Sequence, residues 1–170
     1  MKFIVNNNYI KSYCFESYRD FSQFIEGQDI KKLKLEESHG NKYYCYLGHD
    51  SLSQKKLFAI CFESDKKESD LNLLVWNSKK LLVLDSGMNL FFVDDNLNVK
   101  FVLEMLTPLI GLHITKGDNL LVLEEDSARL ISAEGDILKS ESFDFIDDFS
   151  IENNLLYLQV NGEKKTFDLE

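Results

Sequence analysis

The sequence is poor in residues that interrupt or cross-link a chain: it has one proline, eight glycines and three cysteines among 170 residues. So little proline and glycine leaves no obvious linker, and we expect a single domain over residues 1–170. A chain of this size can bury roughly 70% of its unfolded surface, so it needs no disulfide framework. Cys14, Cys45 and Cys61 each lie beside aromatic or apolar residues, which predicts buried free thiols in a reducing compartment.

Long apolar runs are also missing. No run approaches the ~20 apolar residues of a membrane-spanning helix. The N-terminal run, Phe3–Val5, is too short for the core of a secretory signal. The sequence therefore predicts a cytoplasmic protein that does not bind a membrane. Its many Lys, Asn, Ile and Phe residues are typical of an AT-rich, bacterial genome.

Complete motifs for catalysis or metal binding are absent. The sequence has no Gly-x-Ser-x-Gly, no phosphate-binding glycine loop and no His-Glu-x-x-His. Asp94-x-Asn96-x-Asn98 matches the first ligands of a calcium loop, but a valine holds the sixth position, where glycine is needed. Cys45 and His49 have a spacing seen in zinc sites, without a second pair. We therefore expect no enzymatic activity, no catalytic residues, no metal site and no cofactor.

What the sequence does contain is short apolar runs separated by turn residues. Four such runs fill Leu71–Glu104, and their ends are marked by Gly, Asn, Asp and Ser. The connections are too short for parallel crossovers, so we expect an antiparallel meander. The inner runs Leu81–Leu84 and Leu90–Val93 do not alternate apolar with polar residues, which predicts strands buried on both faces.

The first 70 residues mix strands with a helix. Aromatic residues at helical spacing predict one helix over residues 18–26, with Ser17 at its start and Gly27 at its end. Further apolar runs predict strands at residues 3–5, 9–15, 30–35, 42–47 and 56–63. We expect residues 1–70 to form an irregular cap of strands and helix on the remainder of the chain.

The pattern of residues 71–104 recurs along the chain. Leu81–Asp85 is echoed by Leu120–Glu124 and by Leu155–Leu158, at spacings of 39 and 35 residues. A four-stranded unit of about 40 residues resembles a β-propeller blade, and the resemblance covers residues 71–170. It implies a mainly β fold of antiparallel meander sheets in an open, partial propeller-like arrangement with one short N-terminal helix. A β-sandwich is the alternative. The third copy ends before a fourth strand.

Negative charge dominates the second half. Residues 1–80 hold 13 Lys or Arg and 11 Asp or Glu, whereas residues 81–170 hold 6 and 18. The acidic groups fall largely at predicted turns, and Glu141–Phe149 mixes carboxylates with aromatic rings, which suits a protein interface. The predicted partner-binding residues are turn acids and one ring: Asp94, Asp95, Glu124, Glu125, Asp126, Asp144, Asp147, Asp148 and Phe149.

These features favour a protein-binding module that neutralises a basic partner through an acidic surface. Nucleic acid would be repelled. In size, charge and fold the chain is similar to immunity proteins of secreted bacterial toxins, which implies inhibition of a cognate toxin by occlusion. The alternatives are a scaffold protein that associates through open sheet edges, or a small-ligand binder or enzyme without a known motif. The competing interpretation of the charge is an acidic face that only aids solubility. The sequence does not indicate an oligomeric state.

Overall fold

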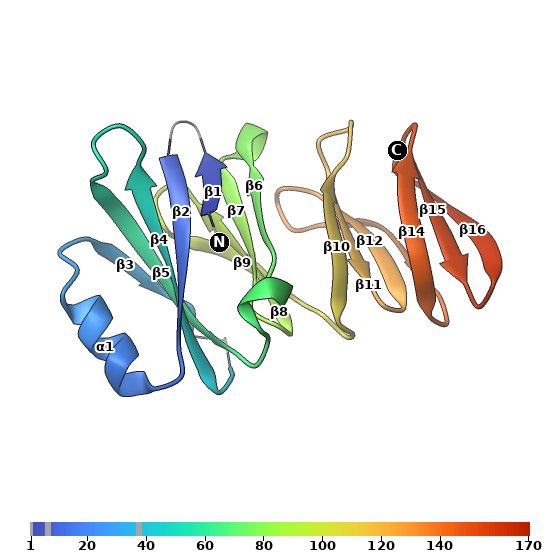
Figure 1. Cartoon of the computed structure of the whole chain (residues 1–170). Helices are drawn as coiled ribbons and strands as arrows, with labels where there is room; N and C mark the ends of the chain where they lie inside the picture. Colours follow the sequence, from blue (N-terminus) through green and yellow to red (C-terminus); the bar gives the residue numbers. More distant parts are fainter. Residues whose placement is uncertain (1, 6–7, 37–38) are drawn as a thin grey trace. The chain divides into compact units, whose positions relative to one another are not determined.

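The computed structural model describes residues 2–5, 8–36 and 39–170, with the side chains of residues 2–5 left out (Figure 1). The chain divides into two compact units, Met1–Val102 (unit 1) and Leu103–Glu170 (unit 2). The boundary expected at residue 70 falls inside unit 1, because the first predicted blade shares a core with the N-terminal sheet. The expectation that residues 1–170 form one domain stays a prediction.

The first sheet of unit 1 has five strands in the order β1-β2-β4-β5-β3. Its strands are β1 (Lys2–Val5), β2 (Asn8–Phe15), β3 (Lys31–Lys34), β4 (Lys42–Asp50) and β5 (Lys56–Ser64). Residues 48–50, expected in a loop, extend β4. β3 pairs with β5 in parallel, whereas the other pairs are antiparallel as expected. The five strands thus form a regular sheet in place of the expected irregular cap.

One face of this sheet is covered by α1 (Tyr18–Glu26), whose predicted bounds are confirmed. The Ser17 hydroxyl accepts a hydrogen bond of 3.2 Å from the Asp20 backbone N–H, which caps the first turn. Phe21 of the helix packs in a buried cluster with Cys45 and Cys61, both free thiols. Cys14 is exposed, so the prediction of a buried thiol is wrong at this position: it shares a face of β2 with the buried Ile10 and Ser12, but it lies near the end of the strand, where its side chain stays open to solvent.

The second sheet of unit 1 is the predicted meander. Its strands, in the order β6-β7-β8-β9, are β6 (Leu73–Trp76), β7 (Leu81–Asp85), β8 (Asn89–Asp94) and β9 (Val99–Glu104). Single 3₁₀ turns precede and follow β6, at Glu68–Asp70 (η1) and Asn77–Lys79 (η2). Four consecutive residues of β8, from Leu90 to Val93, are buried, which confirms the expected burial on both faces. Tyr46 and Ile60 of the first sheet pack with Phe91 in one core.

Unit 2 repeats the meander. One sheet contains β10 (Leu109–Ile114), β11 (Leu120–Glu124), β12 (Ser127–Ile131) and β13 (Ile137–Ser142). The other contains β14 (Ile146–Glu152), β15 (Leu155–Val160) and β16 (Glu163–Asp168). Their facing side chains share a second core. The predicted repeat is confirmed, because β7, β11 and β15 are each the second strand of a sheet, and the last sheet has three strands. The predicted class, mainly β with antiparallel meanders and one α-helix, is confirmed within the described residues.

Candidate protein-interaction site

The net negative charge of the chain lies in unit 2. Residues 103–170 hold 5 Lys or Arg against 15 Asp or Glu, whereas residues 1–102 hold 14 of each. The net charge of −10 is therefore carried by unit 2 alone. Ion pairs join Glu124 to Arg129 and Asp168 to Lys139. Five cations cannot balance the remaining acids, so the surface of unit 2 attracts positively charged partners.

Glu124, the last residue of β11, is the buried anchor of this unit. Its carboxylate is 1% exposed and forms an ion pair with the Arg129 guanidinium from β12. It also accepts hydrogen bonds from the backbone N–H groups of Leu106, at 2.7 Å, and Thr107, at 3.1 Å. The Ser127 hydroxyl donates a further bond of 3.2 Å. A buried carboxylate needs several such donors, and here they hold the segment before β10 against the β11–β12 turn.

Further hydrogen bonds join the β13–β14 connection to the β11–β12 turn. The Glu125 N–H donates to the Pro108 carbonyl at 3.0 Å, and the Thr107 hydroxyl donates to the Asp126 carboxylate at 2.7 Å. From the β13–β14 connection, the Phe143 N–H donates to the Asp126 carbonyl at 2.7 Å. The Ile146 N–H donates to the Glu125 carbonyl at 2.8 Å. Three loops distant in sequence therefore lie together at one end of unit 2.

The side chains that these loops expose combine apolar groups with carboxylates. Leu106 is 80% exposed and Phe145 is 49% exposed, although both are large apolar residues. We call the set the acidic loop cluster; its members are Leu106, Glu125, Asp126, Asp144, Phe145, Asp147, Asp148 and Phe149. Exposed apolar side chains among polar ones are typical of a protein-interaction surface.

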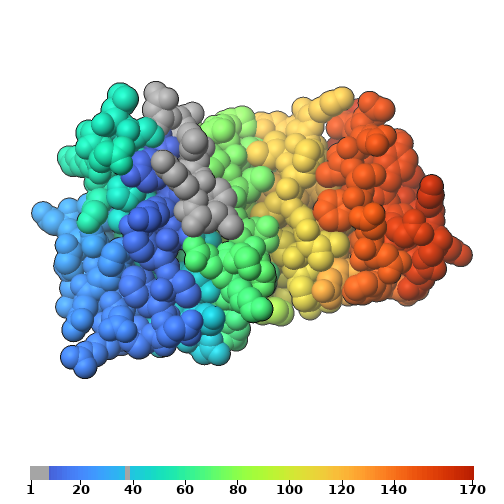
Figure 2. All heavy atoms as spheres, viewed as in Figure 1, coloured from blue at the N-terminus to red at the C-terminus, as the bar shows by residue number. Residues whose placement is uncertain are grey.

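β14 positions the last members of the cluster. A β-bulge between Ile146 and Asp148 leaves Asp147 as the extra residue, and both aspartates are exposed. Phe149 is 36% exposed and lies on β10, where a Cβ added to Gly111 would be 3.0 Å from its ring. The absence of a side chain at Gly111 therefore lets the ring settle against β10. Side chains of β14, β15 and β16 form the orange to red surface of unit 2 in Figure 2.

The structure thus brings together six of the predicted contact residues and corrects the placement of a seventh. Glu125, Asp126, Asp144, Asp147, Asp148 and Phe149 all belong to the acidic loop cluster. Glu124 was predicted as a surface acid, but it is buried against Arg129 and orders the loops instead. Sequence reasoning did not single out Leu106 and Phe145, whose exposed apolar side chains belong to the same cluster. The available signal was an apolar side chain next to a turn acid, as for Phe145, or two residues before a turn proline, as for Leu106.

Asp94 and Asp95 are in unit 1, in the turn between β8 and β9, and line a cavity there. The Asp94 carboxylate accepts backbone hydrogen bonds from Asn98, at 2.8 Å, and from Asn96, at 3.0 Å. The backbone bond from Asn98 is the main reason why the pKa of Asp94 lies below its ordinary value. The calcium-like spacing at this position belongs to a hydrogen-bonded turn in this structure.

Neither a metal cluster nor a membrane helix is found in the part of the chain that the structure describes. No group of three or more His, Cys, Asp and Glu side chains there is placed to hold a metal ion. None of its helices has the length and apolarity required to cross a membrane.

Comparison with known proteins finds a likeness in fold. No family model matches the chain, and no curated protein matches it in sequence. BamB from Moraxella catarrhalis is 17% identical over 73% of this chain and 39% of its own, with a TM-score of 0.51. Dihydro-heme d1 dehydrogenase NirN, in complex with DHE, is 15% identical over 75% and 32%, with a TM-score of 0.54. The WD40 domain of Neurospora crassa Pan2 is 12% identical over 80% and 44%, with a TM-score of 0.49.

The chain spans between about a third and two fifths of the length of the two structures with the higher TM-scores. At such low identity the likeness concerns the fold alone, and it carries no activity or ligand over to this chain. The expected resemblance to propeller blades is confirmed at that level. The solved structures to which the chain is similar are β-propeller proteins, and its antiparallel sheets are of the propeller type.

Proposed function

We propose that the chain is a protein-binding module whose acidic loop cluster binds a basic protein. The observation that supports this proposal most is the concentration of the net charge in unit 2, where three hydrogen-bonded loops present carboxylates around exposed apolar side chains. Charged rims steer a partner of opposite sign and set its orientation, whereas buried rings supply most of the affinity. In this proposal Phe145 and Leu106 are the apolar anchors, and the surrounding acids select a basic partner.

The finer form of the proposal is that the chain is a bacterial immunity protein. It neutralises a cognate toxin in the cytoplasm by covering the lysines and arginines with which the toxin binds its own substrate. Two features support this form: the small size of the chain and a strongly acidic surface built on a rigid sheet. A rigid binding surface loses little conformational freedom when it binds, which favours tight occlusion.

The experiment compares two charge reversals that change the net charge equally. Asp147→Lys with Asp148→Lys alters the acidic loop cluster, and Asp29→Lys with Glu36→Lys alters exposed acids of unit 1. The partner is the protein product of an adjacent reading frame, and its binding to the immobilised full chain is measured over a salt series. We expect association with the wild type to slow steeply as salt rises. The cluster reversal should weaken binding by ~2 kcal/mol or more, as for close charge pairs.

A third variant tests the apolar anchor. Phe145→Ala should weaken binding by ~2 kcal/mol or more while leaving the association rate nearly unchanged, because it removes contact area and no charge. Equal effects of the two charge reversals would refute the acidic loop cluster as the binding site. An acidic partner would refute the electrostatic basis of the proposal. A partner that does not poison cells lacking this protein would refute the immunity form alone.

A further inference from the structure

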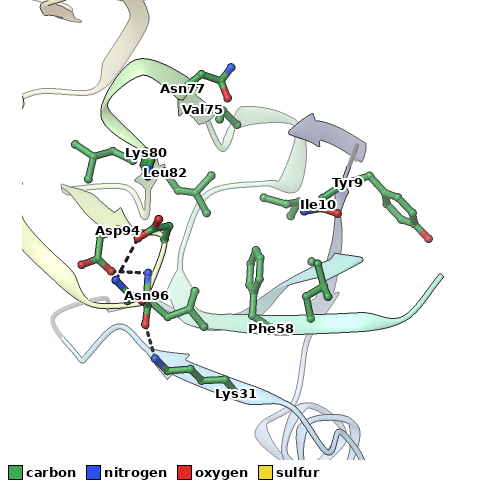
Figure 3. Close-up of a pocket in the computed structure, with 16 residues that line it drawn as sticks. Tyr9, Ile10, Lys31, Phe58, Val75, Asn77, Lys80, Leu82, Asp94 and Asn96 are labelled. Carbon is green, nitrogen blue, oxygen red and sulfur yellow. Dashed lines mark hydrogen bonds between the residues drawn. The ribbon is translucent and has the colours of Figure 1, made fainter. Parts of the chain in front are cut away.

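Unit 1 contains a cavity of about 590 Å³, at one end of its two facing sheets (Figure 3). Small-molecule sites in proteins have volumes of roughly 300–1,000 Å³, so this cavity is large enough for a ligand. Figure 3 shows Ile10 and Phe58 of the first sheet on one side, with Val75 and Leu82 of the second sheet across from them. It lies within unit 1 and contains no member of the acidic loop cluster.

The apolar wall of the cavity depends on one glycine. Gly48 and Phe58 are directly opposite in the β4–β5 pair, and a Cβ on Gly48 would lie 2.4 Å from the Phe58 ring. Only glycine therefore permits the ring to lie across β4. This packing leaves the Phe58 side chain half-buried at the cavity wall, beside Ile10 of the unit 1 core. The interior thus presents an aromatic face and branched aliphatic groups to whatever enters.

The charged groups at the rim are not equivalent. The Asp94 and Asp95 carboxylates accept hydrogen bonds from the amides of the same turn, and the bonds of Asp94 occupy both of its oxygens. The Lys31 ammonium donates to the Asn96 carbonyl, which fixes its place and leaves two of its protons for other acceptors. Lys80, which follows η2, is exposed; its backbone N–H donates to the Asn77 carbonyl, but its ammonium forms no hydrogen bond or ion pair with any residue that the structure describes. The rim therefore offers ammonium donors with free protons, whereas both oxygens of Asp94 and one oxygen of Asp95 already accept hydrogen bonds within the turn.

We propose that this cavity binds a small amphipathic anion, with an apolar ring system held between Phe58 and Leu82 and an acidic head group at Lys31 and Lys80. A carboxylate, sulfonate or phosphate ester fits the head position, since each accepts charge-assisted hydrogen bonds from ammonium groups. This inference goes beyond the proposed function, because it assigns a ligand site to unit 1.

The test uses two fluorescent probes with the same apolar body. Anilinonaphthalene sulfonate carries an anionic head, and N-phenylnaphthylamine lacks it. The single tryptophan of the chain, Trp76, lies between the lining residues Val75 and Asn77, so energy transfer from Trp76 reports a probe in the cavity. We expect the full chain to bind one anionic probe with transfer from Trp76. It should bind the neutral probe about tenfold more weakly, the equivalent of one charge-assisted hydrogen bond.

Variants locate the head and the body of the probe separately. Lys80→Met should lower the affinity for the anionic probe about tenfold and leave the affinity for the neutral probe unchanged. Lys34→Met is the matched control, because Lys34 is an exposed lysine of β3 that does not line the cavity. Val75→Phe should lower the affinity for both probes, because the larger side chain fills part of the cavity. Equal binding of the two probes, equal losses in both lysine variants, or binding without transfer from Trp76 would each overturn the proposal.

Discussion

Replacing Glu124 by alanine should destabilise unit 2 more than any neighbouring acidic substitution. The variant removes the carboxylate that pairs with Arg129, whose side chain is 11% exposed. It leaves a buried guanidinium without its counter-charge, and it removes the acceptor for the Leu106 and Thr107 N–H groups. Breaking a buried pair on one side costs about 3–5 kcal/mol in the free energy of unfolding. Glu141, an exposed acid of β13, should cost no more than ~0.5 kcal/mol when it is changed to alanine.

Urea unfolding monitored by two signals is the appropriate assay. Far-ultraviolet circular dichroism follows the strands of both units, whereas the fluorescence of Trp76 follows unit 1. If the units unfold separately, Glu124→Ala should shift the transition followed by dichroism to a lower urea concentration. The transition followed by Trp76 fluorescence should then keep its midpoint. If they unfold together, both signals should shift equally, and the single-domain prediction is supported.

A double variant separates the ion pair from simple loss of packing. Glu124→Ala together with Arg129→Ala should be less destabilised than the sum of the two single variants, because the second change removes the charge that the first one strands. Strict additivity, or a cost below ~1 kcal/mol for Glu124→Ala, would refute the anchoring role that we assign to this carboxylate.

Two further predictions concern titratable groups. One of the three thiols, Cys14, should react with a disulfide reagent in the native protein, and Cys45 and Cys61 should react only on unfolding; equal rates for all three would contradict the structure. Asp94 has a folded pKa below its ordinary value, so its stabilising effect is present above the ordinary carboxyl pKa of about 3.9 and is lost as the pH falls through the folded pKa. Asp94→Asn should therefore lose less stability than wild type when melting temperatures are compared over that acidic range, and parallel curves would contradict this expectation.

Local patterns were sufficient to predict most of the elements. The helix over residues 18–26 and the repeating strands were readable because capping residues, turn residues and apolar spacing act over a few positions. The parallel pairing of β3 with β5 was not readable, because Lys31–Lys34 joins a strand about 25 residues later, and no local signal names that partner. Six of the predicted contact residues lie in one cluster because the β11–β12 turn and the β13–β14 connection are joined by hydrogen bonds; that they bind a partner stays a prediction.

The burial of Glu124 was missed because an acid at the end of a strand was interpreted as a turn acid. Its partner left a signal: Arg129 is the one cation between Lys116 and Lys139. A lone arginine on an otherwise apolar strand requires a counter-charge nearby, and Glu124 is five residues away. The cavity of unit 1 could not be anticipated, since it is formed by segments distant in sequence, and the role of Gly48 depends on which residue lies opposite.

The buried acid at the end of the second strand has a consequence for the order in which the sheets open. Asp85 ends β7 and is bound by Lys66, Asn72 and the Gly87 N–H. Glu124 holds the same place in β11. The third copy has Gln159 at this place, in a sheet of three strands. This sheet therefore lacks the buried carboxylate that ties the loops together in the other two meanders. The free energy of opening, measured by amide hydrogen exchange, should therefore be lower for β14, β15 and β16 than for β11.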